Sequence, residues 1–294
     1  MTKPLVSVVI PVFDRQKSCL AAIASVQAQR EIACEIIVVD DASQEPFVLA
    51  TESAGPHTVR VLRHQANAGA AAARNTGVQS ANGRWIAFLD SDDVWLSGKL
   101  VSQIVFAQRG HASGWPKLTC VMCGFRQVSL ANGAAQHRIP IDSWDVADFA
   151  AGCWFAPGST ALVPADAFAI VGLMDATLPR LEDLDWYLRL ALAGGGVASV
   201  PNVLADIYVS NAASASKVDL SAQLLRTKWL SASSGKLSAD VTRNLKAYLA
   251  LEQAKAQLGS RQYGQFSRSI IESFVLRPRP RLPLRKWWSS VPNA

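Results

Sequence analysis

Residues 6–14 read VSVVIPVFD, an unbroken apolar and β-branched run that ends in an acidic side chain. A run of this kind is typical of a strand buried on both faces of a parallel sheet. The same pattern returns at residues 35–43, EIIVVDDAS, and at residues 85–93, WIAFLDSDD. The sequence therefore predicts three buried strands, each followed directly by carboxylates. The predicted strands are Val6–Val12, Glu35–Val39 and Trp85–Leu89.

Segments of helical character separate these strands. Ser18–Gln29 shows apolar residues at helical spacing, and Ser97–Gln108 is similar. An alanine-rich helix is predicted to run from Asn67, as its N-cap, to about Ser80, after a further strand over Val59–Leu62. Strands and helices that alternate in this way favour an α/β fold with a mostly parallel sheet flanked by helices.

The middle of the chain is less regular. Lys117–Val128 is typical of a strand, the Asn-Gly pair at 132–133 indicates a hairpin, and Ser159–Val163 predicts another strand. A helix over Leu184–Ala193 ends at three glycines, and a strand over Val197–Val200 closes the α/β part. Three more helices are predicted, over Leu220–Leu230, Ala239–Leu258 and Gln262–Phe274. We therefore divide the chain into an α/β domain, residues 1–210, a helical extension, 211–276, and a tail, 277–294.

The tail carries much of the net charge of +6. It contains RPRPR at residues 277–281 and RKWW at residues 285–288. Basic residues beside tryptophan suit attachment to an anionic membrane surface, while a solvated tail or one packed on the helices remains the alternative. Because the charge is confined to one segment without a nucleic-acid motif, we expect no nucleic-acid partner.

Neither a signal peptide nor an apolar run long enough to span a bilayer is apparent. The expected location is cytoplasmic, with the tail as a candidate peripheral anchor on the inner face of the plasma membrane. The five cysteines suit a reducing compartment, and the lone CxxC of Cys120 and Cys123 is interpreted as a pair of buried thiols. His57 and His64 flank a predicted surface strand, and we expect both to be solvated.

Carboxylates follow three strands of the predicted parallel sheet. They are Asp14 after the first strand, Asp40 and Asp41 after the second, and Asp90, Asp92 and Asp93 after the fourth. The carboxyl ends of parallel strands share one edge, where open α/β proteins bind ligands. Like charges so close together repel, and Mg²⁺ or Mn²⁺ would relieve that repulsion. The alternative interpretation is that each is a turn or capping residue.

The chain resembles the family 2 glycosyltransferases, which have the GT-A fold. Five segments carry the resemblance in the family's order, and together they cover about residues 5–208. The segments are VSVVIPVFD at 6–14, IIVVDDAS at 36–43, NAGAAAARNTG at 67–77, GRWIAFLDSDD at 83–93 and EDLDWYLR at 182–189. The helical remainder lies outside the resemblance.

The resemblance implies a nucleotide-sugar site at the strand ends. Pro11 and Phe13 would flank the uracil and ribose, and Asp41 would accept a hydrogen bond from the base. Asp40 would support the same loop, and Arg74 would lie near the nucleotide crevice. These roles point to a UDP-sugar as donor.

The resemblance also implies the metal and the base. Asp90 and Asp92 form the DxD-type motif, with Asp92 as ligand of Mn²⁺ or Mg²⁺ and Asp90 reaching the ribose or a metal-bound water. Of the pair Glu182 and Asp183, we choose Asp183 as catalytic base and place Glu182 at the acceptor site. The family is inverting, and the acceptor would be a hydroxyl of a glycan or lipid-linked sugar in surface polysaccharide, lipopolysaccharide or glycolipid synthesis.

The chemistry is consistent with these residue types. A divalent cation stabilises a departing diphosphate, and one carboxylate activates the attacking hydroxyl. Asp183 could instead only stabilise a helix dipole, and Asp185 is a candidate i,i+4 ion pair with Arg189. Trp154 is interpreted either as a sugar-stacking residue of the acceptor site or as core.

Two alternative functions are less well supported by these residues. A nucleotidyltransferase also uses paired aspartates with Mg²⁺, but residues 11–15, PVFDR, replace the glycine-rich basic loop that it would usually have. A non-catalytic nucleotide-sugar sensor would be expected to lose the base or the metal acid, and this chain retains Asp183 and Asp92.

Overall fold

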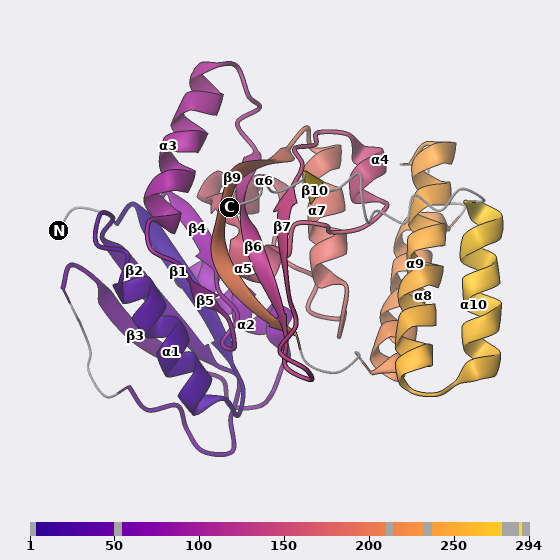
Figure 1. Cartoon of the computed structure of the whole chain (residues 1–294), viewed down its shortest axis with the longest axis horizontal. Helices are drawn as coiled ribbons and strands as arrows, with labels where there is room; N and C mark the ends of the chain where they lie inside the picture. The colour runs from indigo at the N-terminus through magenta and orange to yellow at the C-terminus, as the bar shows by residue number, and fades with distance from the viewer. Residues whose placement is uncertain (1–3, 50–54, 210–213, 232–236, 278–287, 290–294) are drawn as a thin grey trace.

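The structure is a computed structural model that describes residues 4–49, 55–209, 214–231, 237–277 and 288–289. A single curved sheet runs through the α/β part, with helices packed on both of its faces (Figure 1). Three further helices stand side by side at the end of the molecule opposite the first strands (Figure 1).

The first half of the sheet is parallel, as the sequence predicts. Its strand order is β3 (Thr58–Arg63), β2 (Cys34–Asp40), β1 (Val6–Val12) and β4 (Trp85–Phe88). Val8 and Ile10 of β1 belong to one core and Val9 between them belongs to another, because successive residues of a strand face opposite sides. Both sides are covered, which is why the run lacks polar alternation.

Helix α1 (Gln16–Gln27) connects β1 to β2, α2 (Ala70–Ser80) connects β3 to β4, and α3 (Lys99–Ala112) follows the parallel half, all close to their predicted positions. The predicted N-cap of the alanine-rich helix is wrong. Gly69, at φ 90°, holds the N-cap position of α2, and the Asn67 side chain donates to the Asp41 carbonyl instead (3.2 Å).

The second half of the sheet is mixed rather than parallel. β8 (Leu162–Pro164) joins β4 antiparallel, and β6 (Thr119–Ser129) joins β8 antiparallel. The predicted hairpin joins β6 to β7 (Ala135–Pro140), and a two-strand hairpin must be antiparallel. The remaining strands are β9 (Gly196–Val209), parallel to β6, β5 (Val94–Trp95), paired with β9, and β10 (Trp288–Ser289), paired with β7.

Two predicted strands differ from the structure. The segment predicted as a strand over 159–163 begins instead in the short helix α5 (Pro157–Thr160), which has proline at a first-turn position that favours helix initiation. The strand predicted over 197–200 continues through β9 to Val209, because its far half pairs with the long strand β6. The other helices of this part are α4 (Val146–Phe149), α6 (Ala165–Val171) and α7 (Glu182–Leu192).

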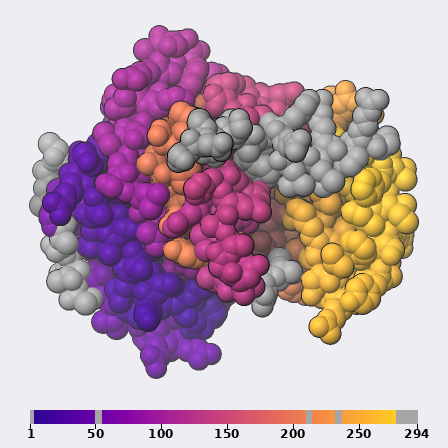
Figure 2. Space-filling view, viewed as in Figure 1, coloured from indigo at the N-terminus to yellow at the C-terminus, as the bar shows by residue number. Residues whose placement is uncertain are grey.

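The helical extension consists of α8 (Ala215–Leu230), α9 (Ala239–Gly259) and α10 (Tyr263–Leu276). It shares a hydrophobic core with the α/β part, since Trp229 and Leu245 belong to the same buried cluster as Trp186 of α7. In the space-filling view the three helices form the orange and yellow body beside the pink segments (Figure 2). The boundary at residue 210 stays a prediction.

Among the described residues, no helix is both long and apolar enough to cross a membrane. The predicted tail anchor lies outside the described residues, apart from Arg277 and the backbone of β10. Cys120 and Cys123 are buried free thiols of β6, as predicted. The prediction that both histidines are solvated is wrong, because His57 is 1% exposed and His64 is held between two side chains.

A buried carboxylate ties α7 to the extension. Asp185 is fully buried and accepts from Arg189 Nε (2.9 Å), the predicted i,i+4 pair. It also accepts from Trp229 Nε1 of α8 (2.9 Å), and Lys228 Nζ lies 3.0 Å from it. Three donors from two helices therefore meet at one carboxylate.

We predict that Asp185→Asn lowers the free energy of unfolding by about 2 kcal/mol, because charged hydrogen bonds in a buried site are lost. Urea denaturation measures the change. The matched control is Asp240→Asn, whose side chain is 78% exposed beside Arg243 and should leave stability unchanged. Equal stability of the two variants would contradict a structural role for Asp185.

Candidate active site

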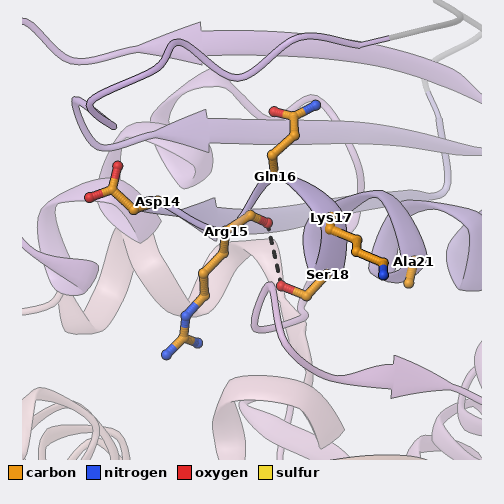
Figure 3. A pocket seen from close by; sticks show the side chains of 6 residues that line it. All are labelled: Asp14, Arg15, Gln16, Lys17, Ser18 and Ala21. Atoms are coloured by element: carbon orange, nitrogen blue, oxygen red, sulfur yellow. Dashed lines mark hydrogen bonds between the residues drawn. The ribbon is translucent and has the colours of Figure 1, made fainter.

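The loops after β1 and β2 are bound to each other at the carboxyl edge of the sheet. The backbone N–H of Asp14 donates to Ser43 Oγ (2.9 Å), and the N–H of Gln44 donates to Asp14 Oδ1 (2.7 Å). A cavity of about 320 Å³ lies between the two loops. A shallower hollow of about 530 Å³ continues along the start of α1, where the side chains of Asp14 and Arg15 point away from the helix (Figure 3).

Asp40 is the support of the loop after β2. Its Oδ1 accepts from the Ser43 N–H (2.9 Å), its Oδ2 accepts from the Phe47 N–H (3.0 Å), and Arg63 pairs with it. Burial alone would raise the pKa of Asp40, but these hydrogen bonds outweigh burial and lower it. Asp40 is completely buried, so it acts on a ligand only through the loop.

Asp41 is hydrogen-bonded to the loop that precedes α2. Its Oδ1 accepts from the Ala68 N–H (2.9 Å) and contacts His64 Nδ1 (2.7 Å), and its Oδ2 accepts from the Gly69 N–H (2.7 Å). The residue is 4% exposed. These contacts hold the carboxylate of Asp41 against the loop before α2, and its hydrogen bond to a base stays a prediction.

Two residues flank this edge as the resemblance implies. Phe13 is 45% exposed directly after β1, and Pro11 is half-buried within the strand. An exposed aromatic ring can cover one face of a planar base. Their contact with a nucleoside stays a prediction.

Arg74 joins two acidic residues that are far apart in the sequence. Its Nη2 donates to Asp90 Oδ1 (2.6 Å), and its Nη1 donates to Glu182 Oε1 (2.8 Å). Burial alone would lower the pKa of Arg74, but the two carboxylates outweigh burial and raise it. The guanidinium therefore stays charged and connects the end of β4 to the start of α7.

Asp92 is paired with Arg15, a contact for which the sequence carried no signal. Burial raises the pKa of Asp92, and Arg15 opposes that rise. The side chains of Asp90 and Asp92 are 36% and 27% exposed, so both remain open to a ligand.

The bound metal ion stays a prediction. A Mg²⁺ or Mn²⁺ ion bound with a nucleotide needs only one or two protein carboxylates, since water and phosphate fill its other positions. Asp90 and Asp92 meet that requirement if their carboxylate oxygens bind the ion as well as the guanidinium groups of Arg74 and Arg15. Within the ranges that the structure describes, no group of three or more Asp, Glu, His or Cys residues is arranged to hold an ion.

A cavity of about 270 Å³ lies beside Arg74 and contains Asp90, Glu182 and Asp183 in its wall. Burial raises the pKa of Asp183 to about 6, with a further rise from the charge of Glu182, while Arg74 and Arg180 oppose it. A carboxyl group with this pKa is largely ionised near neutrality and is still basic enough to accept a proton. Asp90 and the chosen base are thus brought together on one cavity.

Asp93 has a structural environment that the sequence did not anticipate. It accepts from Ser159 Oγ of α5 and from the Tyr208 N–H of β9 (2.9 Å). Ser159 Oγ also accepts from the Asp90 N–H (3.1 Å), and a Cβ at Gly158 would collide with the Asp90 carboxylate. Helix α5, which precedes β8 in the second half of the sheet, therefore fixes the position of Asp90.

The structure decides between the two interpretations of Trp154. The residue is 3% exposed, packs edge-on against Phe155, and donates from Nε1 to the Ile141 carbonyl (3.0 Å). A ring enclosed in this way has no free face for a sugar, so the acceptor-site assignment of Trp154 is wrong and the core interpretation holds. Glu182, the other acceptor candidate, lines the cavity beside Asp183.

We predict that Glu182→Gln lowers the pKa of Asp183 below about 6, because a neighbouring negative charge is removed. Carbon-13 NMR of aspartate-labelled protein reports the titration, and the Asp183→Asn variant assigns the signal. The control Glu272→Gln lies on α10 beside Arg226 and should change nothing. An unchanged or raised pKa in Glu182→Gln would contradict the proximity of the two charges.

The family model of the glycosyl transferase family 2 matches residues 7–155. The Escherichia coli enzyme UDP-Glc:alpha-D-GlcNAc-diphosphoundecaprenol beta-1,3-glucosyltransferase WfgD is 36% identical over 109 residues, which are 37% of this chain and 43% of that protein. The Bacillus subtilis glycosyltransferase TuaG, named for teichuronic acid biosynthesis, is 38% identical over 106 residues, 35% of this chain and 42% of that protein. The aligned segments thus span less than half of either relative.

A solved structure shares the fold across nearly the whole chain. S. aureus TarS 1-349 in complex with UDP-GlcNAc aligns with a TM-score of 0.58 and 15% identity, over 96% of this chain and 92% of that one. The alignment includes the region of the helical extension as well as the GT-A-like sheet. The family model, which covers half of the chain, establishes that this protein belongs to the family 2 glycosyltransferases.

Proposed function

We propose that the protein transfers a sugar with inversion from a UDP-sugar donor to a hydroxyl group of a lipid-linked or glycan acceptor. The observation that carries this proposal is the 270 Å³ cavity, which has both Asp90 and Asp183 in its wall. Such a cavity offers a diphosphate-facing acid and a base to the same bound substrates. The family membership supports the reaction type.

In the proposed reaction the acceptor hydroxyl attacks the anomeric carbon from the face opposite the diphosphate. Asp183 takes the hydroxyl proton, a new carbon–oxygen bond forms, and the bond from the anomeric carbon to the β-phosphate oxygen breaks with its electron pair leaving on UDP. A single displacement inverts the anomeric centre. It requires no nucleophile from the protein.

The donor half of the site would use the edge formed by β1, β2 and β4. Pro11 and Phe13 would flank the nucleoside, and Asp40 and Asp41 would hold the loops that shape its cavity. A divalent cation held by Asp92 and Asp90 would stabilise the charge on the departing diphosphate. Arg15 and Arg74 now neutralise these same two acids, and they are suitably placed to contact phosphate oxygens when a nucleotide arrives.

The acceptor proposal draws on the relatives. WfgD is named for transfer to a GlcNAc-diphosphoundecaprenol, and TuaG for an envelope polymer. We therefore propose an acceptor sugar linked to a lipid diphosphate, in the synthesis of a surface polysaccharide, lipopolysaccharide or glycolipid. We expect specificity to depend on loops around residues 125–180, which extend beyond the segment that the family model covers.

A cytoplasmic location at the inner face of the plasma membrane suits an acceptor of this kind. Helix α10, which leads into the basic tail, exposes Ile271 by 60% and Val275 by 74%. Apolar side chains beside a run of arginines favour an anionic lipid surface. We propose that the tail and this helix face keep the enzyme near its substrate.

Family membership argues against the nucleotidyltransferase alternative, in agreement with the PVFDR loop at residues 11–15. A non-catalytic sensor differs from the proposed enzyme in one measurable respect, which is turnover. The base test below therefore also addresses that alternative.

We predict that Asp183→Asn lowers the transfer rate by about 10²–10⁴-fold, the usual contribution of a general base. In the wild type, kcat/KM should rise with pH through about 6 and then level off, because only the ionised carboxylate accepts a proton. The assay pairs UDP-glucose, UDP-galactose or UDP-GlcNAc with a GlcNAc-α-diphosphate that carries a short alkyl chain.

The exposed Asp166 of α6 provides the matched control, since Asp166→Asn removes a carboxylate outside the cavity and should retain full activity. Transfer by Asp183→Asn at the wild-type rate would rule out Asp183 as the base. If Asp183→Asn lost the pH dependence of kcat/KM but kept the wild-type rate, Asp183 would likewise be ruled out as the base.

A further inference from the structure

The helical extension contributes side chains to the cavity that contains the base. Tyr248 and Glu252, which are four residues apart on α9, line the same 270 Å³ cavity as Asp183. Residues at this spacing lie on one face of a helix. The extension therefore closes the site, although it lies outside the segments that carry the family resemblance.

Tyr248 is held in a defined position. A Cβ at Gly152 would collide with the Tyr248 ring, and Gly152 has a φ of +133° that disfavours other residues. Burial raises the pKa of the Tyr248 hydroxyl, and the neighbouring Glu252 carboxylate raises it further, while Glu252 accepts from Lys255 Nζ (2.7 Å). The ring and the carboxylate thus form a preorganised pair facing the cavity.

A second tyrosine in the cavity has an unfilled hydrogen-bonding site. Tyr187 of α7 is 1% exposed, and among the described residues its hydroxyl has no hydrogen-bond partner. Buried hydroxyl groups are rarely left in this state. A hydroxyl group of a bound ligand would complete the hydrogen bonding of Tyr187.

The charged side chains in the cavity wall limit the charge of the ligand that can bind there. Five acidic side chains line it, against the two guanidinium groups of Arg74 and Arg180. Burial raises the pKa of Asp93 to about 8, so the charged carboxylates near neutrality are Asp90, Glu182, Asp183 and Glu252. Arg74 is already committed to two of them, so an anionic group entering beside α9 would be repelled. A neutral sugar, whose hydroxyls donate to carboxylates and whose ring packs on an aromatic face, fits this wall.

We propose that Tyr248, Glu252 and Tyr187 form the subsite for the neutral sugar unit of the acceptor, the unit that presents its hydroxyl to Asp183. This inference rests on the proposed function, because it takes Asp183 as the base. The nucleotide edge lies at the ends of β1 and β2 and involves none of the three residues. The diphosphate of a lipid-linked acceptor would lie outside the acidic cavity, toward the exposed Arg180 at its margin.

The test separates the acceptor from the donor. Glu252→Gln and Tyr248→Phe are assayed for transfer to the alkyl GlcNAc-α-diphosphate, and separately for hydrolysis of the UDP-sugar in the absence of acceptor. We expect the acceptor KM to rise about tenfold in each variant, the usual effect of losing one hydrogen bond of a charged or buried group. Acceptor-free hydrolysis and the KM for the UDP-sugar should not change.

The matched control is Glu272→Gln on α10, which should retain the wild-type acceptor KM. An unchanged acceptor KM in Glu252→Gln and Tyr248→Phe would overturn the subsite, as would an equal loss of acceptor-free hydrolysis, which would indicate donor binding. Thermal melting of each variant shows that the fold is retained. If the proposed function itself were wrong, the result would be different, because the wild type would then show neither transfer to the acceptor nor hydrolysis of the UDP-sugar.

Discussion

The ion pairs of Arg74 hold the two halves of the site together. One guanidinium reaches Asp90 at the end of a parallel strand and Glu182 at the first turn of α7, over distances of 2.6 and 2.8 Å. Without a cation at this point, several carboxylates would face one another in a partly buried space and repel. Arg74 offsets this repulsion between carboxylates and leaves the side chain of Asp90 partly exposed.

The helices of the extension become part of the same arrangement. Asp185 of α7 binds Trp229 of α8, and the buried cluster around Trp186 continues into α9. The position of Asp183 at the start of α7 and the position of Tyr248 on α9 are thus fixed by one packed core. Specificity can change through residues of the extension while the nucleotide edge stays the same.

Much of the parallel half could be predicted from the sequence, because a strand buried on both faces leaves an unbroken apolar run, as in Val6–Val12. Strand direction predicted that the aspartates lie at one edge of the sheet, but it did not predict that Asp14 lines one cavity there and Asp90 and Asp93 line another. The pairing of Arg15 with Asp92, the burial of Trp154 and the approach of Tyr248 could not be predicted, because they depend on tertiary contacts between distant segments. The short helix α5 was missed for a local reason, since a four-residue segment carries no periodicity.

Calorimetric titration with UDP, with and without Mn²⁺, tests the assignment of the strand-end edge most directly. If Asp90 and Asp92 bind the diphosphate together with a metal ion, UDP binding should require Mn²⁺ and should be lost in Asp92→Asn. Metal-independent binding that the variant retains would contradict the metal assignment. The absence of UDP binding under every metal condition would contradict the UDP-sugar donor itself.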